Sequence, residues 1–265
     1  MAEPVRFADL QNKVVWITGA AKGMGLAMAQ AFAAQGARLA LLDIDKPGLE
    51  QAKQSLQLAA DRCILLEASV VKASAMEQAA ASVVDAFGQI DVLINNAGIS
   101  MNKPTLEMEA LEWQKAVDIN LNGTFYGAQA AGRRIVARRS GVIVNMGSVY
   151  GVSSAPNRAA YCATKSAVVA LSQSLAAEWA PYAVRVNALC PGYVETPFLA
   201  DLMQRGVLDR ESLQARIPAG VLASPEQIAQ VALYMSSEAS SYMTGHAMVV
   251  DGGWTADSFK ALKQN

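Results

Sequence analysis

Short apolar runs alternate with helix-like segments along nearly the whole chain, and this alternation limits the fold more than any other feature. The apolar runs cover residues 13–18, 38–43, 62–67, 90–94, 142–146, 184–189 and 246–251. Strands that alternate with helices build a parallel sheet, because each helix carries the chain back across a face of the sheet. The sequence therefore predicts an α/β fold with one doubly wound, parallel, seven-stranded sheet and helices on both faces. We expect residues 1–265 to form a single domain.

Composition and charge exclude several classes of function. The net charge of −1 provides no field that would attract nucleic acid or an anionic membrane. Cys63, Cys162 and Cys190 are scattered without metal-ligand spacing, which indicates reduced thiols, a cytoplasmic protein and no structural metal. His246 is the sole histidine, so histidine-based triads and most zinc chemistry are excluded. We also expect no signal peptide and no membrane span, because no apolar run has the required length.

A glycine-rich turn follows the first apolar run. It reads Gly19-Ala-Ala-Lys-Gly23-Met-Gly25 and leads into an alanine-rich, helix-like segment. Such glycines let the backbone approach a pyrophosphate, which the free N–H groups at the helix amino end then bind. The spacing Gly-x-x-x-Gly-x-Gly differs from the usual dinucleotide pattern, so a turn that serves packing alone is the alternative. Because strand, glycine turn and helix occur in this order, we expect a Rossmann-type dinucleotide site.

Asp43 ends the second apolar run, about twenty residues after the glycines. A carboxylate at that place binds the ribose hydroxyls of NAD and repels the 2′-phosphate of NADP. Lys22 argues the other way, because a cation in the glycine turn can help to hold a phosphate. A plain turn residue at the strand end is the alternative for Asp43. We give Asp43 more weight, because it would lie against the 2′-oxygen itself, and expect NAD rather than NADP.

Two further turns are expected at the same edge of the sheet. Residues 95–98 read Asn-Asn-Ala-Gly after the fourth apolar run, where small side chains would let a flat ring lie close to the backbone. A bare turn is the alternative there. Residues 190–197 turn across the edge after the sixth run. We expect the segment at about 193–220 to form a lid over a substrate.

Residues 109–139 read as one long helical segment that contains Asn120. Asparagine is mildly unfavourable inside a helix, so we expect its amide to interrupt the hydrogen-bond ladder and to hold a water. A bland polar helix residue is an equal alternative. Four arginines near the end of the segment are expected to be solvated at the helix terminus: Arg133, Arg134, Arg138 and Arg139.

Tyr161 and Lys165 lie four residues apart in a helical segment that follows the fifth apolar run. This spacing puts both side chains on one face of the helix. Lowering the pKa of a phenol from about 10 to about 7 needs roughly 4 kcal/mol. One ammonium about 4 Å away supplies about that much at an effective dielectric constant of 20. The pair therefore predicts a phenolate base, and the alternative is a half-buried tyrosine beside a snorkelling lysine. Ser148 follows the strand, at the edge where open α/β sheets bind their ligands.

Together these pieces resemble the short-chain dehydrogenase/reductase family, in its single-domain, NAD(P)-dependent branch. The resemblance covers the chain from Lys13 to Gly253. The motifs that carry it occur in the order of the family: Thr18-Gly19-x-x-x-Gly23-x-Gly25, Asn95-Asn96-Ala97-Gly98, Ser148 with Tyr161-x-x-x-Lys165, and Pro191-Gly192.

The resemblance implies catalytic roles for four residues. Tyr161 would take the alcohol proton, or return it in reduction, and Ser148 would hydrogen-bond the reacting oxygen. Lys165 would lower the pKa of Tyr161 and hold the nicotinamide ribose. Asn120 would anchor a water in the proton relay. Bound NAD⁺ would add its own positive charge near Tyr161, which also favours the phenolate.

The resemblance likewise implies a cofactor site along the carboxyl edge of the sheet. One departure is that many relatives have an acid near the adenine, where this chain has Ser69-Val70. The residues expected to contact the cofactor are Gly19, Lys22, Gly23, Met24 and Gly25 (pyrophosphate), Asp43 and Ile44 (ribose), Ser69 and Val70 (adenine), and Asn96, Ala97, Gly98, Tyr161, Lys165, Pro191, Gly192, Val194 and Thr196.

We therefore expect an NAD-dependent oxidoreductase that interconverts a secondary alcohol, or a sugar-type hydroxyl, and its carbonyl. The alternatives are an NADP-dependent carbonyl reductase and a non-catalytic dinucleotide-binding or scaffold protein. The expected partners are a small-molecule substrate and, by resemblance, further copies of the chain in a homotetramer or homodimer. Arg158 and Lys103 could meet an acidic group of a substrate, and simple exposure at the surface is an equal alternative for either. The candidate substrate residues are Ser100, Ser148, Ala155, Arg158 and Tyr193.

Overall fold

A computed structural model of the protein describes residues 5–204, 206 and 208–257. Its centre is a seven-stranded parallel sheet with the strand order β3-β2-β1-β4-β5-β6-β7, as the alternation of the sequence predicts. The order reverses direction at β1 and β4, and in open α/β sheets this switch point is where ligands bind. The strands are β1 (Val14–Thr18), β2 (Arg38–Asp43), β3 (Cys63–Glu67), β4 (Val92–Asn95), β5 (Gly141–Met146), β6 (Val184–Pro191) and β7 (Ala247–Val250).

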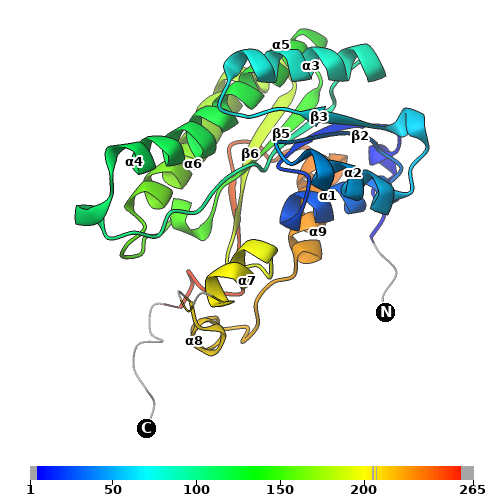
Figure 1. Ribbon diagram of the computed structural model, residues 1–265. Helices are drawn as coiled ribbons and strands as arrows, with labels where there is room; N and C mark the ends of the chain where they lie inside the picture. Colours follow the sequence, from blue (N-terminus) through cyan, green and yellow to red (C-terminus); the bar gives the residue numbers. More distant parts are fainter. Residues whose placement is uncertain (1–4, 205, 207, 258–265) are drawn as a thin grey trace.

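Helices cover both faces of the sheet (Figure 1). Those of one face are α1 (Gly23–Ala34), α2 (Lys46–Leu56) and α9 (Pro225–Ser236). Those of the other face are α3 (Ala73–Phe87), α5 (Gly123–Arg138) and α6 (Ala159–Trp179). The remaining helices are α4 (Ala110–Ala116), α7 (Pro197–Gln204) and α8 (Arg210–Arg216).

The side chains of β1 show why this sheet is buried on both faces. Val15 and Ile17 pack against the layer of α1 and α9, whereas Val14 and Trp16 pack against the layer of α3 and α5. All four are fully buried. Successive residues of a strand point to opposite faces, so a strand covered on both faces reads as a continuous apolar run. The sequence pattern of an unbroken run is therefore a direct consequence of the two helical layers.

The long segment at residues 109–139 is helical, but it is not one regular α-helix. A π-helical turn, Val117–Asn122, separates α4 from α5 and contains Asn120. The segment therefore departs from a regular helix at Asn120, as expected, although the Asn120 amide bonds to Ile99 outside the segment and not to the helix backbone.

The arginines near the end of α5 are largely solvated, as expected, since Arg133, Arg138 and Arg139 are exposed. Some of them also have acidic partners. Arg138 forms an ion pair with the buried Asp91 at 2.9 Å, and Arg133 reaches Glu77 at 3.0 Å.

A buried chain of polar side chains ties the sheet to α6. The amide of Asn95 on β4 donates to the Asn145 side chain on β5 at 2.9 Å, and Asn145 donates to Ser172 on α6 at 3.0 Å. All three side chains are almost fully buried. Polar groups without water must find partners within the protein, so this chain fixes the position of α6 over the strand ends. The amino end of α6 carries Tyr161 and Lys165.

Candidate functional site

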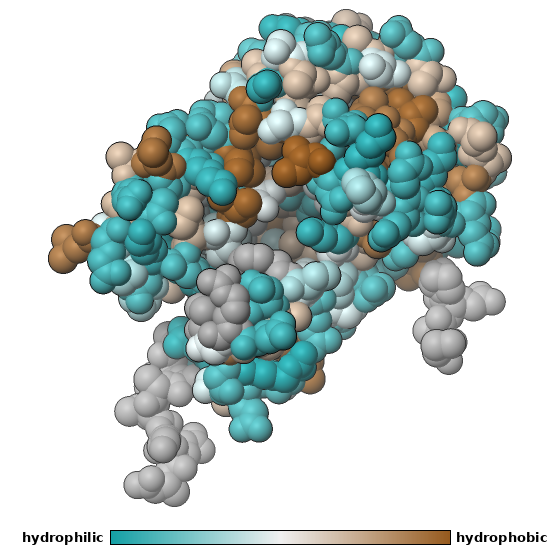
Figure 2. Space-filling model, in the orientation of Figure 1, coloured by the Kyte–Doolittle hydropathy of each residue, from teal (hydrophilic) through white to brown (hydrophobic). Residues whose placement is uncertain are grey.

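The predicted site residues meet at the carboxyl edge of the sheet. Parallel strands end at one edge, so the turns after β1, β4, β5 and β6 lie together there. The segment with α7 and α8 lies beyond this edge (Figure 1), within the range expected for a lid. Figure 2 shows a hollow between that segment and the body of the sheet. A cavity of about 120 Å³ lies in this region.

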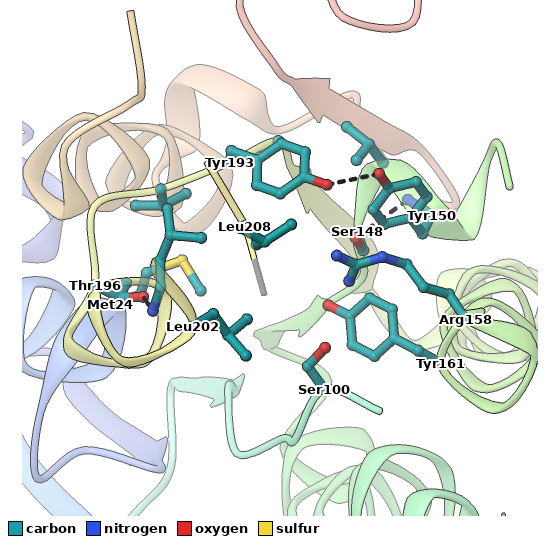
Figure 3. A pocket seen from close by; sticks show the side chains of 14 residues that line it. Met24, Ser100, Ser148, Tyr150, Arg158, Tyr161, Tyr193, Thr196, Leu202 and Leu208 are labelled. Carbon is teal, nitrogen blue, oxygen red and sulfur yellow. Dashed lines mark hydrogen bonds between the residues drawn. The ribbon is translucent and has the colours of Figure 1, made fainter. Parts of the chain in front are cut away.

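The cavity brings together residues that are far apart in the sequence. Tyr161, Ser148 and Ser100 direct their hydroxyl groups toward it (Figure 3). Met24 of the first turn of α1 and Thr196 lie on its other side. Its remaining lining residues are Val149, Tyr150, Arg158, Gly192, Tyr193, Val194, Leu199, Leu202 and Leu208.

The four residues proposed for catalysis surround this cavity: Ser148 and the half-buried Tyr161 lie at its wall, and Asn120 and Lys165 lie behind it. Ser148 and Lys165 are each 5% exposed and Asn120 is fully buried. The Nζ atom of Lys165 lies 5.9 Å from the centre of the Tyr161 ring and donates to the carbonyl oxygen of Met146 at 2.6 Å. The expected proximity of Tyr161 and Lys165 is thus present. The ammonium, however, is bound to the end of β5.

The charge balance at Tyr161 differs from the expectation. Burial raises the pKa of the Tyr161 phenol, and a hydrogen bond from Ser148 and the positive charge of Arg158 only partly oppose this. Burial also lowers the pKa of Lys165 to about 8. The prediction that one neighbouring ammonium brings the phenol near neutrality is therefore wrong for the protein by itself. Its reason is physical: spacing along a helix fixes the face of a side chain, but not how much water it loses.

Asn120 joins the turn after β4 to α6. Its Oδ1 atom accepts from the backbone N–H of Ile99 at 2.8 Å, and its Nδ2 atom donates to the Ile99 carbonyl at 2.9 Å. Nδ2 also lies 3.2 Å from the Thr164 hydroxyl on α6. A Cβ atom added to Gly98 would lie 3.2 Å from Asn120 Oδ1 and 3.5 Å from Lys165 Nζ, so the backbone here passes close to both side chains. π-helical turns frequently occur at functional sites.

The glycine turn has the backbone that its sequence predicts. Gly19 and Gly23 adopt φ values of +65° and +58°, which favour glycine. A Cβ atom on Gly25 would lie 2.0 Å from the Gly19 carbonyl oxygen, so α1 can approach β1 this closely only with glycine there. Lys22 precedes α1 and gives no side-chain cap, which leaves the first amides of the helix free for an anion. The turn therefore fits a diphosphate group.

Asn96 has a structural task that the sequence did not reveal. Its side-chain amide donates to the carbonyl oxygens of Thr18 and Gly19 at 3.0 and 2.9 Å. The hydroxyl of Thr18 in turn accepts from the backbone N–H groups of Asn96 and Ala97 at 3.0 and 3.1 Å. These bonds lock the turn after β4 onto the glycine turn. Asn96 thus holds the shape of the expected cofactor site.

The residues expected at the adenosine end lie at the ends of β2 and β3. The Asp43 carboxylate accepts from the backbone N–H of Ala21 in the glycine turn and from that of Asp45, both at 3.1 Å. Ile44 is 72% exposed, which is unusual for a side chain of this kind and leaves it free to contact a flat ring. Val70 is buried, whereas Ser69 is partly accessible. The donor set and the exposed surface fit the adenosine half of NAD.

The structure changes the list of candidate substrate residues. Ala155 does not line the cavity, and Lys103 is paired with Glu112 at 2.6 Å. Tyr150 is a lining residue that sequence reasoning missed, and its hydroxyl lies 2.8 Å from that of Tyr193. Its position two residues after Ser148 was the available signal.

In the part of the chain that the structure describes, no group of three or more His, Cys, Asp or Glu side chains could hold a metal ion, and no helix is long and apolar enough to cross a membrane.

Comparison with known proteins places this geometry in context. A family model described as enoyl-(acyl carrier protein) reductase matches residues 19–255. Galactitol 2-dehydrogenase (L-tagatose-forming) of Cereibacter sphaeroides is 42% identical over 90% of this chain and 93% of its own length. The NAD-dependent glycerol dehydrogenase of Listeria innocua is 36% identical, over 93% and 95% of the two chains.

Solved structures agree with these sequence relatives. A 3-ketoacyl-(acyl-carrier-protein) reductase from Brucella melitensis, complexed with NADH, superposes with a TM-score of 0.85. The two chains are 33% identical, and the match covers 93% of this chain and 99% of that one.

Proposed function

The chain belongs to the short-chain dehydrogenase/reductase family of alcohol and carbonyl oxidoreductases, and we propose that it uses NAD to interconvert a secondary alcohol, or a sugar-type hydroxyl, and its carbonyl. One observation carries the proposal. The hydroxyl groups of Tyr161 and Ser148 face the same cavity as Met24, which belongs to the uncapped first turn of α1 (Figure 3). A substrate oxygen and a dinucleotide bound at that turn would therefore meet within one cleft.

The residues of the chain divide the chemistry between them. In oxidation, Tyr161 takes the proton of the alcohol oxygen while the hydride leaves the carbinol carbon, and in reduction it returns that proton. Ser148 donates a hydrogen bond to the reacting oxygen, which orients it toward Tyr161. NAD supplies the hydride acceptor and the positive charge of its nicotinamide ring. Ser148 is almost fully buried, so its hydrogen bond to the reacting oxygen would act in a lower effective dielectric than in bulk water.

Lys165 and Asn120 support Tyr161 from behind the cavity. The buried ammonium of Lys165 has one recorded protein acceptor, the carbonyl of Met146, and retains further N–H groups for a ribose hydroxyl. Asn120 fixes the backbone at Ile99 beside it. We propose that these two residues position the nicotinamide half of the cofactor next to the path by which the proton leaves Tyr161. The water in that path stays a prediction.

The proposal is tested by a coupled screen for NADH formation. Purified protein is mixed with NAD⁺ and a panel of polyols, sugars and hydroxy acids at mildly alkaline pH. Polyols belong in the panel because relatives carry the names galactitol and glycerol dehydrogenase. We expect NADH formation with at least one compound. Measurable NADH binding without turnover on any compound would instead support a non-catalytic dinucleotide-binding protein.

Asp43 gives a separate prediction about the choice of cofactor. Its carboxylate is held beside the glycine turn by Ala21, so a 2′-phosphate would approach a fixed negative charge. We expect wild type to favour NAD over NADP by about 100-fold in kcat/KM, and Asp43→Ala to narrow this preference to about 10-fold or less. Steady-state kinetics with both cofactors measure the ratio.

Asp45→Ala is the matched control for that experiment. Asp45 is a second carboxylate two residues further on, but its side chain caps α2 by accepting from Gly48 at 3.0 Å. Its removal should leave the cofactor ratio unchanged. If wild type reacts faster with NADP, the exposed Lys22 outweighs Asp43 and the NADP-dependent carbonyl reductase becomes the correct assignment.

A further inference from the structure

Arg158 occupies an unusual place for a charged side chain. It precedes the first turn of α6 and lines the cavity, where it is the one formally charged residue among the described lining residues. Figure 3 shows its guanidinium group beside the hydroxyls of Ser148 and Tyr161. Its central carbon lies 5.0 Å from the centre of the Tyr150 ring, so one face of the group rests on an aromatic surface.

The guanidinium group also lacks an acidic neighbour in the described part of the chain. Three arginines elsewhere in the fold show the contrast. Arg134 and Arg138 pair with Glu77 and Asp91 at 2.8 and 2.9 Å, and Arg210 pairs with Glu195 at 2.7 Å. Within residues 5–204, 206 and 208–257, the guanidinium group of Arg158 stacks on the Tyr150 ring and forms no ion pair. A partly buried charge needs a partner of opposite charge. The N–H donors of Arg158 face the cavity, so an anionic ligand bound there can supply that partner.

The shape of the cavity narrows the kind of anion. Its far wall consists of Leu199, Leu202 and Leu208, which offer neither donors nor charge. The polar groups gather at the other end, around Ser148, Tyr161 and Arg158 (Figure 3). A planar guanidinium binds a carboxylate through two parallel hydrogen bonds, and a cavity of about 120 Å³ suits a small molecule.

We propose that Arg158 binds the carboxylate of a small hydroxy acid or sugar acid whose carbinol oxygen lies between Ser148 and Tyr161. This inference rests on the proposed function and adds the substrate class. Arg158 and Tyr161 line the same cavity, and Figure 3 shows the guanidinium group beside the Tyr161 hydroxyl. The carboxylate therefore lies only a few bonds from the carbon that is oxidised.

The test compares paired substrates that differ in one group. Each hydroxy acid or sugar acid is assayed beside the neutral polyol with the same carbon skeleton, at a pH where the rate has reached its plateau. We expect wild type to favour the acid, and Arg158→Gln to reduce kcat/KM for the acid by about 30- to 100-fold, mainly through KM. The neutral polyol should change by less than about threefold, so the acid-to-polyol ratio falls to about one.

Two further variants separate recognition of the carboxylate from a structural role. Arg158→Lys keeps the charge without the planar fork, and should restore part of the preference for the acid. Lys103→Gln removes a cation whose backbone is bound to Asn157, next to Arg158, but whose side chain is paired with Glu112, and should leave the ratio unchanged. Each variant is checked for NADH binding, so that a folding defect is recognised.

The possible outcomes distinguish this inference from the function it rests on. If Arg158→Gln lowers kcat/KM equally for the acid and the polyol, Arg158 supports Tyr161 or the fold instead of binding a carboxylate. That result would overturn the inference. Turnover of neutral polyols alone, without any hydroxy acid or sugar acid, would also overturn it, while the oxidoreductase assignment would stand. NADH formation with no compound at all would remove the proposed function itself.

Discussion

Replacement of Tyr161 by phenylalanine is expected to reduce turnover by about 1,000-fold or more, while NADH binding changes by less than about threefold. The phenylalanine ring fills the same volume but has no oxygen to take the proton from the substrate. Tyr161 faces the cavity from the first turn of α6, and the glycine turn that would hold the diphosphate lies on the opposite side. NADH formation measures turnover, and a fluorescence titration measures binding.

Tyr150→Phe is the matched control. Tyr150 lines the same cavity and is almost fully buried, and its hydroxyl is hydrogen-bonded to that of Tyr193. Loss of that bond should lower activity by about tenfold at most. Full activity of Tyr161→Phe would remove Tyr161 from the chemistry. If Tyr161→Phe loses NADH binding together with turnover, Tyr161 has a structural role instead.

Replacement of Lys165 by methionine is expected to reduce turnover by about 100-fold or more and, at neutral pH, to stabilise the protein. Burial lowers the pKa of Lys165 from its usual 10.5 to about 8. Below pH 8 the folded protein therefore holds a buried ammonium at a cost of about 3 kcal/mol. Methionine avoids this cost but loses the hydrogen bond to Met146, worth about 1 kcal/mol. The variant should thus gain about 2 kcal/mol in the free energy of unfolding at pH 7.

The sign of the pH dependence follows from proton binding. Between pH 8 and 10.5 the unfolded chain keeps the Lys165 proton while the folded protein has released it, so rising pH stabilises wild type relative to the variant. The advantage of Lys165→Met should therefore shrink over that interval. Urea unfolding of both proteins at pH 7 and pH 10 measures the difference. A variant that is less stable than wild type at pH 7 would show that Lys165 is not strained by burial.

The sequence predicts the fold well because its main signals are local. An apolar run such as β1 is buried on both faces, and this alone indicates a covered parallel strand. Gly19 adopts a backbone conformation that favours glycine, and Gly25 makes a backbone contact too close for any side chain. The turn can therefore be predicted from its glycines. The break near Asn120 follows in the same way from one residue that disfavours a regular helix.

The remaining features depend on contacts across the fold. The spacing of Tyr161 and Lys165 gave the correct face, but the degree of burial at both residues reverses the direction of the expected pKa shift for the phenol. The sequence also could not show that Asn96 fixes the glycine turn, because that contact spans two strands. Nor could it show that Lys103 is paired while Arg158 faces the cavity. Such partners become visible only when the strand ends are brought together.

The ionisation of Tyr161 tests the account most directly. Ultraviolet absorbance of phenolate is followed against pH in wild type and in Tyr161→Phe, and the difference between them reports this one residue. Without cofactor we expect no phenolate from Tyr161 below its ordinary pKa of 10.0, because the hydroxyl is buried. With saturating NAD⁺ the titration should move downward by about two pH units or more, since a positive ring is then close to the phenol. An identical titration with and without NAD⁺ would contradict the account.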